Sequence, residues 1–428
     1  MENRFAMQAA KVIVVGQGYV GLPLAMRAVA AGFEVVGIDT DTARIASLAE
    51  RRSYVDDISN AELSEAMDSG RYLPSRSYSA AASFDFAVIT VPTPLRDGMP
   101  DLSYVEQSAK SLSRHLSRGA TVILESTTYP GTTEELLVPL LEEGSGLTAG
   151  SDFFVGYSPE RIDPGNPVWG FVNTPKVVSG VNDDSLERVQ GFYDCLVTTT
   201  IPVSSPKEAE LTKLLENTFR HVNIALINEM AVFADDLGVD IWESLEAAAT
   251  KPFGFMKFTP GPGVGGHCLP IDPSYLSWEV RRKLGRTFRF VELANEINDH
   301  MPAHVTKRAA AMLNAQRKSV AGSVILLVGL AYKKNTGDIR ESPALKIIDE
   351  LLEAGAEVRA ADNHVEPYRW PANVAKVDLS PASLAGVDLV ILLTDHDDFD
   401  LSLLETSAVS VFDAKGRLDT RLGHVARL

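Results

Sequence analysis

The stretch Lys11–Ala25, "KVIVVGQGYVGLPLA", decides the fold of the first part of the chain. A run of β-branched residues leads into Gly16, Gly18 and Gly21, which have the G-x-G-x-x-G spacing and open a predicted helix. Glycines at this spacing allow a tight turn and a close approach of the backbone to a pyrophosphate, while the helix N-terminus supplies the positive end of its dipole. We therefore predict that the chain begins with a dinucleotide-binding unit.

An acidic residue stands where such a unit binds a ribose. Asp39 ends the next β-branched run, "FEVVGID". A carboxylate there accepts hydrogen bonds from both ribose hydroxyls and repels a 2′-phosphate, so the sequence favours NAD over NADP. Strand, glycines, helix and acid in this order argue against the alternative of an ordinary turn. Arg44, on the next predicted helix, is either a further contact on the adenosine side or a solvent-exposed arginine.

The alternation of strands and helices continues outward from this unit. Short β-branched runs recur at "DFAVIT", "TVILEST" and "FFVGYSPE", with Ala- and Leu-rich stretches between several of them. After Lys318 the pattern returns at "SVILLVGLAYK", "VRAADN", "VDLVILLTD" and "SAVSVFDA". This predicts the α/β class, with two Rossmann-like domains that each contain a parallel sheet covered by helices.

One long helix is expected between the two α/β parts. Ser205–Gly238 starts with a plausible N-cap followed by proline, and its apolar residues recur at intervals of three and four. A helix of this length usually spans domains or pairs with a second chain. We therefore divide the chain into 1–204, 205–317 and 318–428 and expect a homodimer built on the long helix.

The composition argues against some classes of partner. The chain of 428 residues has 40 Lys and Arg against 57 Asp and Glu, a formal net charge of −17. This excess of acid argues against binding to nucleic acids or to acidic membranes. No run of about 20 apolar residues occurs, and "MENRFAMQAA" lacks the pattern of a signal peptide, so we expect a cytoplasmic protein without membrane association.

The stretch Gly261–Pro273, "GPGVGGHCLPIDP", surrounds one of only two cysteines with glycines and prolines. Glycines let the backbone approach a bulky ligand, so Cys268 is either a nucleophile whose thiolate a nearby cation favours or a small buried hydrophobe. Cys195, in the apolar "FYDCLVTTT", is expected to be structural, and both thiols are expected to be free. His267 has no partner with the spacing of a metal ligand, and we predict no metal site.

Polar residues elsewhere suggest further parts of a site. Lys213 and Asn217 stand at i and i+4 of the long helix, where they either stabilise a developing oxyanion or form a solvated pair. Thr127 in "ESTTYPG" and Glu160 in "GYSPERIDPGNP" follow predicted strands, as does the basic segment "GLAYKKNTGDIRES". Open α/β sheets bind ligands at these strand ends, although capping, turn or solvated-loop roles are the alternatives.

Together these motifs resemble those of the nucleotide-sugar 6-dehydrogenases, the family of UDP-glucose, UDP-N-acetylglucosamine and UDP-N-acetylmannosamine dehydrogenases. The resemblance covers nearly the whole chain and rests on "GQGYVGLPLA", "VPTP", "ESTTYPG", "SPERIDPGN", "ELTKLLENTF", "GPGVGGHCLPIDP" and "KKNTGDIRES", in family order. It implies an NAD-binding Rossmann domain, a central helical region used for dimerisation, and a C-terminal Rossmann-like domain that binds the UDP part.

The resemblance also implies roles for individual residues. The implied catalytic residues are Cys268 as the nucleophile, Lys213 and Asn217 at the oxyanion, Asp272 and Thr127 with a catalytic water, and Glu160 in thioester hydrolysis. The implied NAD contacts are Gly16, Gly18, Tyr19, Val20, Gly21, Asp39, Arg44, Thr93, Thr127 and Arg340. The implied substrate contacts are Glu160, Lys213, Asn217, Gly265 and Lys333.

The implied reaction converts the primary alcohol at carbon 6 of the sugar to a carboxylate, which reduces two NAD molecules in turn. Cys268 traps the aldehyde as a thiohemiacetal, the second oxidation leaves a thioester, and water hydrolyses it. "GGHC" and "PERIDPGN" resemble the N-acetylhexosamine branch, which favours UDP-N-acetylglucosamine and a role in polysaccharide biosynthesis.

Other substrates and functions stay open. Lys257 stands where related sequences often have proline, and Asn335 where an aspartate is common, so UDP-glucose or a thymidine-linked sugar is an alternative substrate. A two-electron dehydrogenase of the 3-hydroxyacid or 6-phosphogluconate type shares the Rossmann start and a helical lysine–asparagine pair, but it needs no cysteine. A nucleotide-sugar sensor without turnover is the non-enzymatic alternative.

Overall fold

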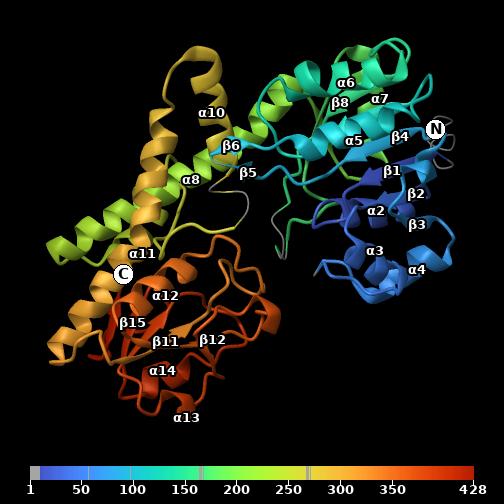
Figure 1. The fold of residues 1–428 in the computed structure, drawn as a ribbon. Coiled ribbons are helices and arrows are strands. Elements are labelled where there is room, and N and C mark those ends of the chain that lie inside the picture. The colour runs from blue at the N-terminus through green and yellow to red at the C-terminus, as the bar shows by residue number, and fades with distance from the viewer. Residues whose placement is uncertain are drawn as a thin grey trace. The chain divides into compact units, whose positions relative to one another are not determined.

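A computed structural model describes residues 10–428 of the chain, except 56, 97, 163–165, 167, 267, 268 and 270. Contacts within the chain divide it into two compact units, Met1–Glu216 and Asn217–Leu428. Each unit contains one large sheet with helices packed against it (Figure 1).

The first unit is built on an eight-stranded sheet whose strands are parallel except for the pair β8–β9. The spatial order is β10 (Thr200–Pro202), β9 (Lys176–Gly180), β8 (Phe154–Tyr157), β7 (Thr121–Leu124), β4 (Phe86–Ile89), β1 (Lys11–Val15), β2 (Glu34–Ile38) and β3 (Tyr72–Ser75). Its helices are α2 (Gly21–Ala30), α3 (Thr42–Ala49), α4 (Asn60–Asp68), α5 (Ser103–Ser113), α6 (Val138–Ser145) and α7 (Asp183–Asp194). Short elements are the hairpin β5 (Leu95–Arg96) and β6 (Met99–Pro100), the 3-10 turn η1 (Tyr78–Ala81) and the π-helical turn η2 (Thr133–Leu137).

Helices cover both faces of this sheet. Val12 and Val14 of β1 belong to a core that includes residues of α2 and α7, whereas Ile13 and Val15 belong to a second core that includes residues of α5 and α6. Since both faces are buried, β1 has a continuous apolar run rather than an alternating one. The first strand, the glycine turn and the helix after it are therefore confirmed.

The second unit is built on a six-stranded sheet in which every pair is parallel. The spatial order is β13 (Ala375–Lys376), β12 (Glu357–Ala361), β11 (Val324–Val328), β14 (Leu389–Leu392), β15 (Ser410–Asp413) and β16 (Val425–Arg427). The helices are α9 (Ile241–Ala249), α10 (Asp272–Leu284), α11 (Arg289–Ala315), α12 (Pro343–Glu353), α13 (Pro381–Leu384) and α14 (Ser402–Thr406), with the turn η3 (Pro367–Arg369). Alternate residues of β11 again enter two different cores.

Helix α8 (Pro206–Leu237) has 32 residues and begins in the first unit and ends in the second. Pro206 is its first residue, and the Ser205 hydroxyl accepts a hydrogen bond from Lys207 N at 3.2 Å, so the expected start is confirmed. Most of its predicted apolar stripe is exposed in the single chain. The exposed members are Leu211, Leu215, Phe219, Leu226, Met230 and Phe233.

The strands predicted from β-branched runs are all present. The sequence analysis missed short or partly polar strands, namely β3, β5, β6, β9, β10, β13 and β16. Among the described residues, no helix combines the length and the apolar composition needed to cross a membrane.

Candidate active site

The glycine turn of the first unit is fixed by close backbone contacts. Gly16 has φ +93°, and a Cβ added to it would lie 2.8 Å from the carbonyl oxygen of Thr90. A Cβ on Gly21 would overlap the carbonyl oxygen of Gly16. At Gly18 the nearest atom is Arg44 Nη1 at 3.8 Å, so space remains over this residue. Two glycines are thus needed for the turn itself, and the third leaves room for a ligand.

Asp39 directly follows β2 and contacts the glycine turn through Gln17. Its carboxylate accepts hydrogen bonds from Gln17 N at 2.9 Å, Asp41 N at 2.9 Å and Arg44 Nη1 at 3.3 Å. The Arg44 guanidinium also lies over the ring of Tyr54, at 5.8 Å from its centroid. Arg44 therefore lies on the side of the turn where the acid would meet a ribose, as the adenosine-side alternative expects.

The donors around this turn fit a dinucleotide. No side chain caps the N-terminus of α2, whose N-cap is Val20, and the neighbouring Tyr19 is partly exposed. An uncapped helix N-terminus beside a glycine turn is a site for a pyrophosphate. These residues of the first unit would hold the cofactor.

The loops after β4 and β7 are tied together next to the turn. Thr93 Oγ1 donates to the carbonyl oxygen of Thr127 at 2.8 Å, and Ser126 Oγ donates to that of Val91 at 2.7 Å. The predicted NAD contacts Thr93 and Thr127 are therefore brought together.

A buried ionic cluster follows the ends of β7 and β8. Lys176 Nζ pairs with Glu125 Oε1 and with Glu160 Oε2, the latter at 3.0 Å. Burial raises the pKa of Glu125 to about 7, against the opposing effect of Lys176. Burial alone would also raise the pKa of Glu160, but Lys176, the amide of Ile162 and the charge of Lys213 together lower it. The sequence analysis missed Lys176 and Glu125, although Glu125 opens the quoted motif "ESTTYPG".

Lys213 of α8 reaches the same cluster. Its Nζ donates to the backbone oxygen of Glu160 at 2.6 Å. Glu210, one turn earlier on α8, accepts hydrogen bonds from Thr133 N and Oγ1 at 2.9 and 2.7 Å and from Gly131 N at 2.5 Å. The first unit thus brings Glu160 and Lys213 together through a direct hydrogen bond, whereas the contact given for Thr127 is with Thr93.

In the second unit, Asn217 and Asp272 form a buried pair. Asn217 Nδ2 donates to Asp272 Oδ2 at 2.5 Å, and both side chains are less than a tenth exposed, at 7% and 3%. Asp272 is the first residue of α10 and the second-last residue of the cysteine stretch. The carboxylate therefore fixes the orientation of the amide.

Gly265 and Gly266 of the cysteine stretch pack against the segment "GLAYKKNTGDIRES". Gly266 N donates to the carbonyl oxygen of Arg340 at 3.0 Å, and a Cβ on Gly265 would lie 2.7 Å from Cβ of Tyr332. Both glycines allow a close approach to Tyr332 of the chain itself, whereas the sequence analysis expected a close approach to a bulky ligand, which stays a prediction. Cys268 and His267 lie outside the described residues.

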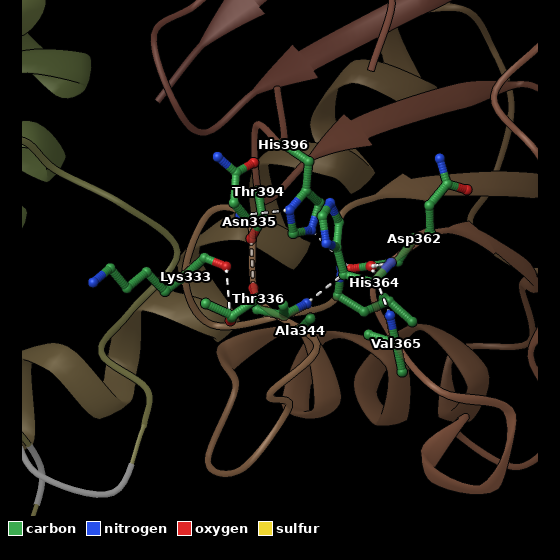
Figure 2. A network of polar contacts seen from close by, with 12 residues as sticks. Lys333, Asn335, Thr336, Ala344, Asp362, His364, Val365, Thr394 and His396 are labelled. Carbon is green, nitrogen blue, oxygen red and sulfur yellow. Dashed lines mark hydrogen bonds and ion pairs between the residues drawn. The ribbon is translucent and has the colours of Figure 1, made fainter. Parts of the chain in front are cut away.

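Lys333 and Arg340, in that same segment, belong to the second unit. Arg340 pairs with Asp338, with Nη2 at 2.6 Å from Oδ2. Figure 2 shows the Lys333 side chain extending away from the histidines of the network. Arg340 is the one predicted NAD contact that belongs to this unit, because the others belong to the first.

Asn335 anchors the Lys333 segment. Its N–H donates to His396 Nδ1 at 2.9 Å (Figure 2), and its side-chain amide exchanges two hydrogen bonds with Asp397, at 2.6 and 2.9 Å. Its φ of +58° is tolerated by asparagine better than by most residues. An aspartate at this position would oppose the carboxylate of Asp397, which gives a physical reason for asparagine here.

Asp362 occupies the position in the second unit that Asp39 occupies in the first, at the end of the second strand. Its carboxylate, which is 0% exposed, accepts from Leu330 N, Ala331 N, His364 N, Val365 N and His396 Nε2. These donors use its acceptor capacity. Asp362 therefore closes its own turn and has no acceptor capacity left for a ribose.

One group among the described residues has the spacing of a metal site. The ligand atoms of His364, His396 and Asp398 lie within 4.8 Å of one another. His396 already uses both ring nitrogens, with Asn335 N and Asp362, so binding a metal would break the network of Figure 2. The absence of a metal stays a prediction.

Comparison with known proteins agrees with this geometry. The chain matches the NAD binding domain of the UDP-glucose/GDP-mannose dehydrogenase family over residues 10–197, its central domain over 207–300 and its UDP binding domain over 326–421. It is 37% identical to the UDP-N-acetyl-D-glucosamine 6-dehydrogenase of Pseudomonas aeruginosa, over 92% of each chain. It is 34% identical to the UDP-N-acetyl-D-mannosamine dehydrogenase of Pyrococcus horikoshii, over 91% of this chain and 90% of that one.

A solved structure is also similar over almost the full length. The structure of the UDP-D-ManNAc dehydrogenase from Pyrococcus horikoshii superimposes with a TM-score of 0.86 and 32% identity, covering 96% of each chain. Three domain matches in family order and relatives above 30% identity establish the family. The chain belongs to the UDP-glucose/GDP-mannose dehydrogenase family and is an NAD-dependent nucleotide-sugar 6-dehydrogenase.

Proposed function

We propose that this enzyme oxidises carbon 6 of UDP-N-acetylglucosamine to the carboxylate through a thioester on Cys268. The substrate proposal rests on the motifs "GGHC" and "PERIDPGN" and is supported by relatives named for N-acetylated hexosamines. When bound, NAD accepts a hydride from carbon 6 in each of the two oxidations.

The observation that carries the mechanism is the placement of the polar groups on α8. Lys213 is held on the Glu160 carbonyl, and Asn217 is oriented by Asp272. A turn of helix separates Lys213 from Asn217, so both side chains lie on one face of α8. We propose that this face stabilises the oxyanion that forms when the Cys268 thiolate adds to the aldehyde, and again when water adds to the thioester.

The remaining groups move protons. The alcohol loses its hydroxyl proton in the first oxidation, and the attacking water loses one during hydrolysis, so a proton acceptor must be available near carbon 6. We propose Asp272, with Thr127, as the group that orients this water and Glu160 as the base for hydrolysis. The low pKa of Glu160 keeps it ionised at neutral pH, as this role requires.

The test of the substrate is NADH production across a panel of nucleotide sugars, with mass analysis of the product. UDP-N-acetylglucosamine should give the highest kcat/KM and a product heavier by the change from CH₂OH to COO⁻. A higher kcat/KM with UDP-N-acetylmannosamine, UDP-glucose or a thymidine-linked glucose would contradict the proposed substrate but leave the proposed reaction unchanged. One NADH per sugar, in place of two, would support the two-electron type of dehydrogenase.

We also propose that two copies of the chain pair through α8. The exposed apolar residues of its stripe are large and recur at helical spacing, which is typical of a covered surface. The division into 1–204, 205–317 and 318–428 likewise stays a proposal, supported by family matches that end and begin near 204 and 317.

A further inference from the structure

Three ionisable residues, one of them the proposed base, meet where three neighbouring strands of the first sheet end or begin. Glu125 follows β7, Glu160 follows β8, and Lys176 begins β9. Because β9 runs antiparallel to β8, the start of β9 lies at the same edge as the ends of β7 and β8. The reversed strand is what brings a lysine between the two carboxylates.

Two members of this cluster are buried, and Glu160 is slightly exposed. The side chain of Lys176 is 5% exposed, that of Glu125 is 0% exposed and that of Glu160 is 13% exposed. The hydroxyl of Tyr193 donates to Glu125 Oε2 at 3.3 Å, and the ammonium of Lys176 lies 5.2 Å from the centroid of the Tyr193 ring. Buried ion pairs are often replaceable by apolar residues without loss of stability, so folding alone gives no reason for charges here.

The contacts of Glu160 show what the cluster controls. Glu160 Oε1 accepts from the amides of Arg161 and Ile162, both at 2.6 Å, and Oε2 accepts from Lys176. Its backbone oxygen accepts from Lys213. A carboxylate offers about four acceptor positions, so these three donors leave one for a water. The position of Lys176 therefore sets the orientation of the carboxylate and of the turn that holds Lys213.

We infer that Lys176 is a positioning residue for thioester hydrolysis: its ammonium, anchored by Glu125, keeps the Glu160 carboxylate ionised and oriented. Lys176 acts through Glu160 and takes no part in the first oxidation. The inference rests on the proposed function, because it assigns Lys176 to a step that exists only if a thioester forms. Burial is the main cause of the raised pKa of Glu125, and the charge of Glu160 adds to it.

The test separates the two half-reactions in Lys176→Met, Lys176→Arg and a control, Lys110→Met. Lys110 is exposed on α5 and forms a weak surface ion pair with Glu106 (3.8 Å), so its replacement by methionine should change neither step. Each enzyme is mixed with UDP-N-acetylglucosamine and excess NAD. NADH formation, the acyl-enzyme by intact mass, and its decay as a function of pH are followed.

In Lys176→Met, acyl-enzyme should accumulate and its hydrolysis should slow by about 10- to 100-fold, while the NADH burst keeps its amplitude. The acid limb of the hydrolysis profile should move to higher pH, because Glu160 has lost the cation that favours its charged form. Lys176→Arg should restore most of the rate.

Equal slowing of both half-reactions with an unmoved acid limb would overturn the inference and leave a structural role. If Lys176→Met does not fold, Lys176→Gln replaces it in the test, because its side-chain amide can still donate a hydrogen bond but carries no charge. The acid limb of this variant should also move to higher pH, and an unmoved acid limb would overturn the inference. If the wild type forms two NADH per sugar, the proposed function holds whatever the Lys176 variants show. If it forms one NADH per sugar, both the proposed function and the inference about Lys176 are wrong.

Discussion

Asp39 is the residue on which the choice of cofactor depends. Its carboxylate is held rigidly by two backbone amides and Arg44, so it cannot swing away from a 2′-phosphate. The wild type should therefore prefer NAD. Asp39→Ala should reduce the ratio of kcat/KM for NAD over NADP by about tenfold or more.

The control for this change is Asp68→Ala, because Asp68 is exposed on α4 and pairs only with Arg51 among the described contacts. It should leave the ratio unchanged. Steady-state kinetics with both cofactors measure the ratio. Comparable kcat/KM values for the two cofactors in the wild type would contradict the role of Asp39.

Lys213 is expected to act on the transition state. Lys213→Ala should lower kcat by about 10² to 10³, which is the usual cost of removing one preorganised oxyanion donor. KM for the sugar should change less than kcat. Lys207→Ala, on the same helix but paired with Glu134 at the surface, should keep kcat near the wild-type value. An equal decrease of kcat in both variants would show that the changes disturb helix α8 and would not support a role for the Lys213 ammonium.

At the scale of secondary structure, Asp362 closes the end of β12 in the second unit. Burial would raise the pKa of its carboxyl group, but His396 and the backbone amides outweigh burial and lower it to about 2, below the ordinary 3.8. A lowered pKa in the folded state stabilises the fold above the unfolded pKa, and this stabilisation is lost as the pH falls toward 2.

Asp362→Asn should therefore destabilise the second unit at pH 7 by about 2 kcal/mol. The variant should also lose less stability than the wild type when the pH is lowered from 5 to 3. Urea unfolding followed by tryptophan fluorescence at both pH values measures the difference. An equal loss of unfolding free energy in the wild type and the variant between pH 5 and pH 3 would show that Asp362 does not cause this pH dependence of stability.

Helix α8 should pair with its copy in a second chain. Leu226→Glu with Met230→Glu places two charges on adjacent turns of the exposed stripe, at residues 52% and 47% exposed. The wild type should be a dimer by light scattering at micromolar concentration, and the double variant a monomer, because charges in an apolar interface are costly to desolvate.

The control is Tyr368→Glu, which alters an exposed apolar residue in the turn η3 and should leave the dimer intact. A monomeric wild type would contradict the proposed pairing.

At the scale of the whole chain, the sequence predicts those structural features that depend on residues close together in the chain. The glycine turn follows from residue spacing, and the length of α8 follows from Ser205, Pro206 and the periodic apolar residues. The hydrogen bond between Asn217 and Asp272 was not predicted, because the two residues are distant in the sequence and the family resemblance implies a separate role for each.

Contacts between residues that are distant in the sequence could not be predicted from local patterns. Lys176 meets Glu125 and Glu160 only because β9 is reversed, and no local pattern indicates that reversal. Asp362 looks like a second ribose-binding acid in the sequence, but its neighbours saturate it. The sequence also predicts an apolar stripe on α8 without showing which part the single chain leaves exposed.

The central claim is a four-electron oxidation through a thioester on Cys268. The most direct measurement mixes Cys268→Ser enzyme with UDP-N-acetylglucosamine and excess NAD, counts NADH by absorbance and searches for an adduct by intact mass. The wild type and Cys195→Ser, which alters the half-buried thiol at the end of α7, should give two NADH per sugar at similar rates. Cys268→Ser should bind both ligands but lose normal turnover, because serine is a far poorer nucleophile at neutral pH. Wild-type rates with two NADH per sugar in Cys268→Ser would contradict the claim.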